Sequence, residues 1–247
     1  MNKNKVVLAG AGTMGASLAQ VYAQAGWDTV LWNRSAAGLE RAKSLISLNQ
    51  ATFIKEGILL EVESNAMLSR IRMTTDKADY QDAALVVESI VEKLDAKQAF
   101  WEEISALVPA EALLATNTSG LKITEIAKAC KHPERFMGQH WLNPPHLLPL
   151  CEIIAGEQTA PENVQKMRTL VKNLGKQPVV VADINGFIIN RIQFALLREA
   201  LHIVDIGAAT VEDVDTALKA GMGLRYAALG PFGVADFGGL DTFDHIN

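Results

Sequence analysis

The sequence contains few of the residues that mark several common classes of protein. Only two of its 247 residues are cysteines, Cys130 and Cys151, and they show no metal-ligand spacing. A disulfide framework and a metal site are therefore not expected, whereas a reducing compartment such as the cytoplasm fits this composition.

Positive charge and long apolar runs are equally scarce. Lys and Arg number 23 against 28 Asp and Glu, so the formal net charge is −5, and no segment is a block of basic residues. Nucleic acid is therefore not an expected partner. No apolar run reaches the roughly 18 residues of a membrane span, and the glycine-interrupted N-terminus does not fit a signal peptide. We expect a cytoplasmic protein with a small-molecule substrate and no membrane partner.

The N-terminal segments alternate short apolar runs with helical patterns. Residues 5–10 form an apolar run, residues 15–26 have helical spacing that ends at a glycine, and residues 28–33 form a second run. A strand, a helix and a strand within about thirty residues make the crossover unit of a parallel sheet. The sequence therefore predicts an α/β fold with a doubly wound, Rossmann-type nucleotide-binding domain.

Later segments continue this pattern with one interruption. Residues 36–69 read as a helical pair, which predicts an insertion that overhangs the site. Further strands are predicted at 71–76, 83–89, 112–119, 135–143, 149–156 and 177–183, with helices at 94–108 and 161–175.

Strand patterns stop near Gly186, and helical patterns cover residues 186–207 and 211–221. We therefore place a dinucleotide-binding domain at 1–183 and a small all-helical domain at 184–247. About sixty residues rarely make a self-sufficient core, so the second domain is expected to dock on the first or on another subunit. The last residues carry no capping signal, so this domain is interpreted as cut short.

The turn after the first predicted strand carries the motif GAGTMG. Gly10 permits a tight turn, Gly12 lets the backbone approach a pyrophosphate, and Gly15 lets helix and strand pack closely. Thr13 and Met14 open the helix whose N-terminus faces the phosphates. The alternative is an ordinary strand-to-helix turn, but the position between strand and helix favours dinucleotide binding.

The segment after the second predicted strand bears on the choice of cofactor. An acid that grips the adenosine ribose of NAD is usual there, but this chain has Asn33, Arg34 and Ser35. Asn33 carries no charge that would repel the 2′-phosphate of NADP, and Arg34 supplies a planar cation that matches phosphate oxygens. The stretch also resembles the NR[ST] segment of NADP-using β-hydroxyacid dehydrogenases. We therefore favour NADP over NAD; the alternative is that Arg34 stacks on adenine while Asn33 serves NAD.

A histidine and a glutamate occupy consecutive predicted strands, His140 and Glu152. A carboxylate at one ring nitrogen holds a histidine in one orientation and makes it more basic, which suits removal of a hydroxyl proton during hydride transfer. Most such pairs in a sequence never meet, so this motif alone does not establish a dyad.

Together these stretches resemble the L-3-hydroxyacyl-CoA dehydrogenase family, including its L-gulonate 3-dehydrogenase, lambda-crystallin and carnitine dehydrogenase branch. Six segments in the family order carry the resemblance: GAGTMG (10–15), VVESIVEKLDAKQAFWEEI (86–104), NTSGL (117–121), RFMGQHWLNPP (135–145), INGFIINRI (184–192) and LGPFGVADFGGLDTF (229–243). The resemblance implies reversible oxidation of an L-3-hydroxyacyl-CoA with hydride transfer to NAD(P), in a homodimer formed through the helical domain.

The resemblance also implies roles for individual residues. His140 would be the general base, Glu152 would orient it, and Ser119 would hydrogen-bond the substrate oxygen. Asn190 would complete the site from the second domain, and Asn143 would help to fix the substrate.

Three further residues, Glu92, Lys97 and Asn117, match family positions near the nicotinamide ribose. Two alternatives remain open: Ser119 as a cap of the next helix, and Lys97 as a solvated helix charge.

Two features depart from the acyl-CoA pattern. The insertion at 36–69 carries three basic and four acidic residues, a net charge of −1, which is not a phosphate-seeking surface. Arg225 is positioned to clamp a substrate carboxylate, although a surface ion pair is an equal alternative. A free 3-hydroxy acid is therefore the alternative substrate, and a non-catalytic binding protein on the same scaffold is the alternative of another class.

Overall fold

The computed structural model describes residues 4–246, and the chain divides into two compact units. The first unit extends to Ile189 and the second begins at Asn190. The boundary predicted after residue 183 stays a prediction about where the two domains meet.

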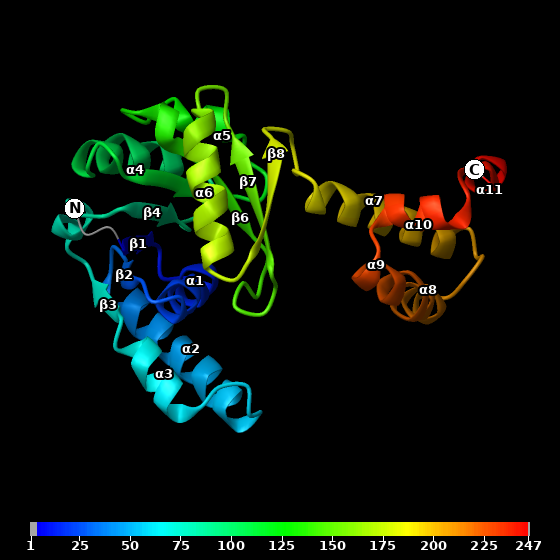
Figure 1. The fold of residues 1–247 in the computed structure, drawn as a ribbon, viewed down its shortest axis with the longest axis horizontal. Helices are drawn as coiled ribbons and strands as arrows, with labels where there is room; N and C mark the ends of the chain where they lie inside the picture. The colour runs from blue at the N-terminus through cyan, green and yellow to red at the C-terminus, as the bar shows by residue number, and fades with distance from the viewer. Residues whose placement is uncertain (1–3, 247) are drawn as a thin grey trace. The chain divides into compact units, whose positions relative to one another are not determined.

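The first unit is built on one eight-stranded sheet with the order β3-β2-β1-β4-β5-β6-β7-β8 (Figure 1). Every neighbouring pair is parallel except β6 and β7, which are antiparallel. The strands are β1 (Lys5–Ala9), β2 (Asp28–Trp32), β3 (Ile71–Thr74), β4 (Leu85–Glu88), β5 (Leu113–Thr116), β6 (Phe136–Trp141), β7 (Leu150–Ala155) and β8 (Gln177–Ala182). This confirms the predicted doubly wound, Rossmann-type α/β fold.

Helices cover both faces of this sheet. They are α1 (Thr13–Gln24), α2 (Ala36–Lys55), α3 (Glu61–Leu68), α4 (Leu94–Leu107), α5 (Ile123–Ala127) and α6 (Pro161–Asn173). Side chains of α1, α2 and α6 share one apolar core with Leu8 and Leu31, while side chains of α4 and α5 share another with Val7 and Val30. Alternate residues of one strand thus enter opposite cores, as the two-residue period of a strand requires.

All eight observed strands end one to three residues before the predicted ends. The residues left over include Asn33, Ser89, Asn117 and Asn143, which follow β2, β4, β5 and β6. These polar residues lie in the loops that follow the strands. The loops gather at one edge of the sheet, because the carboxyl ends of parallel strands lie together. The five-residue helix α5 was not predicted, since no period can be recognised over so short a segment.

The second unit is helical, as the sequence predicts. It contains α7 (Ile189–Asp205), which starts at the unit boundary, then α8 (Val211–Ala217), a π-helical segment (Leu218–Gly223), α9 (Leu224–Ala228), α10 (Pro231–Gly238) and α11 (Leu240–Ile246). Within residues 4–246, none of the helices combines the length and the apolar character needed to cross a bilayer.

Candidate active site

The glycine-rich turn has the geometry that a dinucleotide requires. Gly10 has a φ of 106°, and a Cβ on it would lie 2.5 Å from the Ser89 carbonyl oxygen. A Cβ on Gly15 would lie 1.8 Å from the Gly10 carbonyl oxygen, so helix α1 can approach β1 only with glycine there. Space beside Gly12 is open, which leaves room for a pyrophosphate at the N-terminus of α1. The residues of this turn therefore fit the pyrophosphate of a dinucleotide.

A cavity of about 380 Å³ lies beside this turn, and Gly12, Asn33, Arg34 and Phe100 are among its lining residues. The Asn33 side chain is held in place: its Oδ1 accepts from the Ala11 amide at 3.4 Å and its Nδ2 donates to the Ser35 carbonyl at 2.9 Å. Arg34 is exposed and makes no ion pair or hydrogen bond with the described residues. Its guanidinium is available to a ligand in the cavity.

His140 and Glu152 form a buried dyad, because β6 and β7 pair them directly across the strands. The His140 Nδ1 to Glu152 Oε2 distance is 2.6 Å, and the two side chains are 3% and 1% exposed. The other ring nitrogen, Nε2, lies 3.2 Å from the Ser119 hydroxyl. With Nδ1 bonded to the carboxylate, Nε2 is the atom that can exchange a proton with a substrate.

The second carboxylate oxygen of Glu152 also accepts hydrogen bonds. Its Oε1 accepts hydrogen bonds from the amides of Ile188 and Ile189 at 2.9 and 3.1 Å. Burial raises the pKa of Glu152, but the hydrogen bonds from His140 and these two amides outweigh burial and hold the pKa below its usual value. Glu152 is therefore a charged acceptor that can stabilise an imidazolium.

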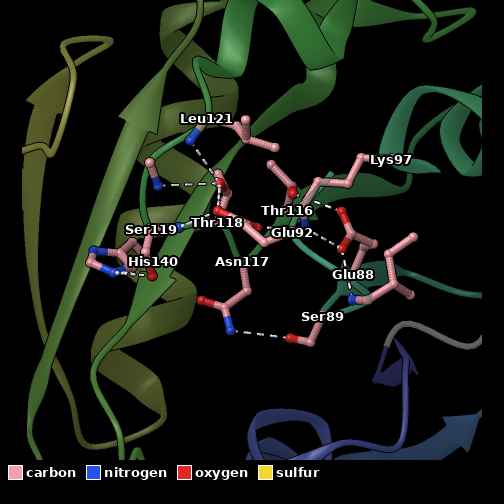
Figure 2. A network of polar contacts seen from close by, with 12 residues as sticks. Glu88, Ser89, Glu92, Lys97, Thr116, Asn117, Thr118, Ser119, Leu121 and His140 are labelled. Atoms are coloured by element: carbon pink, nitrogen blue, oxygen red, sulfur yellow. Dashed lines mark hydrogen bonds and ion pairs between the residues drawn. The ribbon is translucent and has the colours of Figure 1, made fainter. Parts of the chain in front are cut away.

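Ser119 is exposed, and its backbone is held by Glu92. Glu92 Oε1 accepts from the Ser119 amide at 3.0 Å and from the Thr118 hydroxyl (Figure 2). Helix α5 begins at Ile123, and its first amides are capped by Asp183 rather than by Ser119. The alternative of Ser119 as a helix cap is therefore wrong.

Asn117 joins neighbouring strand ends. Its Nδ2 donates to the Ser89 hydroxyl at 3.1 Å, and its Oδ1 accepts from the Trp141 amide at 3.2 Å. The side chain is thereby fixed between the loop after β4 and the end of β6, next to His140.

Lys97 is fully buried on α4, so the alternative of a solvated helix charge is wrong. Its ammonium lies 2.5 Å from Glu88 Oε1 and 3.4 Å from Glu92 Oε2. Lys97, Glu92, Ser119 and His140 thus belong to one connected set of polar side chains (Figure 2).

Three predicted site residues are not brought to this set by the described structure. Asn143 is exposed in the loop after β6. Asn190 and Arg225 lie in the second unit. Their roles at the site stay predictions.

Sequence reasoning missed four residues that shape the site. Glu88 and Thr118 join the polar set described above, and Asp183 caps α5. Phe187, with a φ of 49°, places its ring 5.3 Å from the His140 ring. Glu88 carried a detectable signal, since a carboxylate directly after the apolar run LVV is unusual in a buried strand.

Comparison with known proteins assigns the whole chain to one family. The family model "3-hydroxyacyl-CoA dehydrogenase, NAD binding domain" matches residues 5–184, and the model of the C-terminal domain matches residues 186–247. A 3-hydroxybutyryl-CoA dehydrogenase of Bradyrhizobium diazoefficiens is 38% identical over 96% of this chain and 80% of its own length. A 5-formyl-3-hydroxy-2-methylpyridine 4-carboxylate 5-dehydrogenase of Mesorhizobium japonicum is 37% identical over 98% of this chain and 78% of its own length.

Solved structures agree with these matches. The crystal structure of a 5-formyl-3-hydroxy-2-methylpyridine 4-carboxylic acid 5-dehydrogenase, described as an NAD+-dependent dismutase, superposes with a TM-score of 0.89 at 37% identity, over 98% of this chain and 78% of that one. An (S)-3-hydroxybutyryl-CoA dehydrogenase from Ralstonia eutropha gives 0.85 at 32% identity, over 98% and 84%. A glycine turn fit for a dinucleotide, a buried His–Glu dyad and these matches lead to one conclusion: the chain belongs to the 3-hydroxyacyl-CoA dehydrogenase family and is an NAD(P)-binding oxidoreductase.

Proposed function

We propose that this protein catalyses the reversible oxidation of an L-3-hydroxyacyl-CoA to the 3-oxoacyl-CoA. The observation that carries the proposal is the buried dyad, with Nδ1 of His140 on Glu152 and Nε2 of His140 directed to the Ser119 hydroxyl. The relative from Bradyrhizobium, named a 3-hydroxybutyryl-CoA dehydrogenase, supports this substrate class.

In the oxidation direction, His140 Nε2 takes the proton of the substrate hydroxyl. The Glu152 carboxylate, hydrogen-bonded to Nδ1 at 2.6 Å, stabilises the resulting imidazolium without taking the proton itself. Ser119 hydrogen-bonds the substrate oxygen as the carbonyl forms. Burial of the dyad removes competing water and fixes the ring, and in the reverse direction the imidazolium returns the proton.

Gly10, Gly12, Gly15, Asn33 and Arg34 would hold the nicotinamide dinucleotide along the turn and its cavity. When bound, the cofactor accepts the hydride that leaves carbon 3 of the substrate. Glu92, Lys97 and Asn117 would lie near its nicotinamide ribose. Asn143 and Asn190 would help to hold the substrate.

Turnover of a panel of L-3-hydroxyacyl-CoA thioesters and of the matching free acids tests this proposal. We expect the thioesters to be oxidised, with a 3-oxo product identified by mass spectrometry. Absence of turnover with every 3-hydroxy compound would favour a non-catalytic binding protein on this scaffold.

A second candidate substrate is a small hydroxy compound with a free carboxylate. All seven charged side chains of residues 36–69 are exposed, and their net charge is −1, which does not favour the phosphates of CoA. The relative from Mesorhizobium is named for a pyridine carboxylate substrate. Arg225 would clamp the carboxylate.

Arg225→Met separates the two substrates. Loss of a charge-assisted bidentate bond should cost about 1.5–3 kcal/mol with free acids, while thioesters, whose carboxylate is masked, should be little affected. An equal loss with both substrate types would make Arg225 structural.

We further propose that the cofactor is NADP rather than NAD. Support comes from Asn33 in place of an acid and from the exposed Arg34 without a partner among the described residues. The related dismutase, described as NAD+-dependent, supports the opposite preference. Measurement of kcat/KM with NADPH and with NADH decides between the two cofactors. A higher kcat/KM with NADH would make the proposal wrong.

Finally, we propose a cytoplasmic homodimer formed through the helical unit. Five apolar side chains of α7 are 39–61% exposed: Ile192, Phe194, Leu196, Leu197 and Leu201. Cys130 and Cys151 are unpaired thiols, which suits a reducing compartment. Sedimentation velocity should give a dimer, and Leu201→Glu should give a monomer; a monomeric wild type would contradict the proposal.

A further inference from the structure

Glu88, the last residue of β4, is a buried carboxylate with four hydrogen-bond donors. Its exposed fraction is 0%, and Oε1 accepts from Lys97 Nζ at 2.5 Å and from the Ile90 amide at 2.8 Å. Oε2 accepts from the Thr116 hydroxyl at 2.7 Å and from the Trp101 indole at 3.3 Å. Four donors satisfy this carboxylate, so its orientation is fixed from β4, β5 and α4 together; Figure 2 shows Glu88 with Lys97 and Thr116.

Lys97 links the fixed Glu88 carboxylate to Glu92, a less constrained residue. Its ammonium contacts both Glu88 and Glu92, and Glu92 is 45% exposed. Packing therefore does not fix Glu92, whose position depends on hydrogen bonds and on the Lys97 charge. Glu92 in turn accepts from the Ser119 amide at 3.0 Å.

The contacts continue to the dyad. The Ser119 hydroxyl lies 3.2 Å from His140 Nε2, the atom that exchanges the proton. Glu88, Lys97, Glu92, Ser119 and His140 thus form a continuous path from the sheet interior to the reacting atoms (Figure 2). Replacement of a buried ion pair by apolar residues is often neutral or stabilising, so stability alone does not explain why the Glu88–Lys97 pair is present.

We propose that Glu88 is a positioning residue for the reaction. It holds Lys97, Lys97 holds Glu92, and Glu92 fixes the backbone that places the Ser119 hydroxyl against His140 Nε2. This inference rests on the proposed function, because Ser119 and His140 are its catalytic groups. Glu88 itself is fully buried, so it acts through these residues and not through a surface open to a ligand.

The test is Glu88→Gln, which keeps the size of the side chain and removes its charge. We expect kcat at saturating substrates to fall about tenfold to a hundredfold, since small displacements of a positioned group have effects of this size. In a Ser119→Ala background the same substitution should have little further effect, because the path then ends before His140. Independent, multiplicative effects of the two substitutions would overturn the proposal, as would an unchanged kcat.

Asp79→Asn is the matched control. Asp79 pairs with the buried Lys5 and with Arg72 away from the dyad, so this variant should melt at a lower temperature with kcat unchanged. If Glu88→Gln does not fold, Glu88→Gln with Lys97→Met leaves no unpaired buried charge. This double variant should have the same kcat as Lys97→Met alone, because both substitutions break the same path, and a multiplicative further loss would overturn the proposal.

One measurement does not depend on catalytic activity, so it tests this inference apart from the proposed function. The imidazole NMR signal of His140, assigned by its absence in His140→Gln, should shift in Glu88→Gln and not in Asp79→Asn. An unshifted signal would overturn the positioning role, whereas a shifted signal in a protein without turnover would contradict the proposed function alone.

Discussion

The dyad region and the helical insertion hold their charges in opposite ways. Glu88, Lys97 and Glu152 are buried, and each is held by hydrogen bonds or ion pairs at fixed distances. The seven charged side chains of residues 36–69 are exposed and mixed in sign. Breaking a buried pair by removing one partner costs several kcal/mol, while an exposed pair is worth little. The comparison separates a region of fixed buried charges, where we propose the reaction, from a region of variable exposed charges, where the proposed substrate choice can be tested.

The largest expected effect concerns the buried region. His140→Gln removes the group that exchanges the proton, so kcat should fall by about two to four orders of magnitude. Cofactor affinity, measured by fluorescence titration, should barely change. The exposed His132, paired with Glu134 at the surface, offers the control His132→Gln, which should keep wild-type activity. A His140 variant that keeps more than about a tenth of the wild-type kcat would remove this residue from the mechanism.

The next effect concerns the exposed Arg34. If its guanidinium binds a 2′-phosphate, Arg34→Ala should weaken NADPH binding by about 1.5–3 kcal/mol, or about ten- to a hundredfold. The affinity for NADH should stay within a few-fold of wild type. Arg41→Ala, at another exposed arginine, is the control. Equal loss of both cofactors would mean that Arg34 contacts the adenine instead.

A smaller effect is expected from the insertion. Glu56→Lys together with Glu61→Lys changes the net charge of residues 36–69 from −1 to +3. KM for CoA thioesters should fall about two- to fivefold, since exposed charges contribute about 0.2–1 kcal/mol. Glu102→Lys, an exposed change on α4, should have no such effect. An unchanged KM for thioesters would show that CoA does not lie against the insertion.

The smallest effect is on stability in acid. The pKa of Glu152 lies below its usual 4.5, and the hydrogen bond from Arg72 lowers that of Asp79 from 3.8 to about 2. The unfolded chain therefore binds protons more readily than the folded one. The stability from each carboxylate is present above its usual pKa and is lost as the pH falls through its lowered pKa, which is about 2 for Asp79. Thermal melts between pH 6 and pH 3 should show this loss, with a shallower dependence in Glu152→Gln and Asp79→Asn. An unchanged dependence in both variants would contradict it.

The sequence was sufficient for the sheet and for much of the site. Short apolar runs that end in glycine or in a polar residue located all eight strands, and the glycine turn lies where its motif predicts. His140 and Glu152 were paired only through the family resemblance, because antiparallel pairing of β6 and β7 is a long-range property that no local pattern records.

The buried polar set could not be predicted in full for a related reason. Whether Lys97 lies in solvent or in the core depends on the rotation of α4 against β4. Its partner Glu88 reads as the end of a strand, and only the packed structure shows that four donors meet there. Short elements such as α5, capped by Asp183 from far along the chain, are invisible for the same reason.

Glu152 has a consequence for how this scaffold can change over generations. One of its oxygens serves His140, and the other accepts from the Ile188 and Ile189 amides where α7 begins. In a lineage that keeps the fold but loses the reaction, selection on the imidazole disappears, whereas the two amides that begin α7 still need the Glu152 carboxylate as their acceptor. His140 is then free to drift while Glu152 is retained, so an orphaned glutamate opposite a substituted histidine would be the trace left by an enzyme that has become a binding protein.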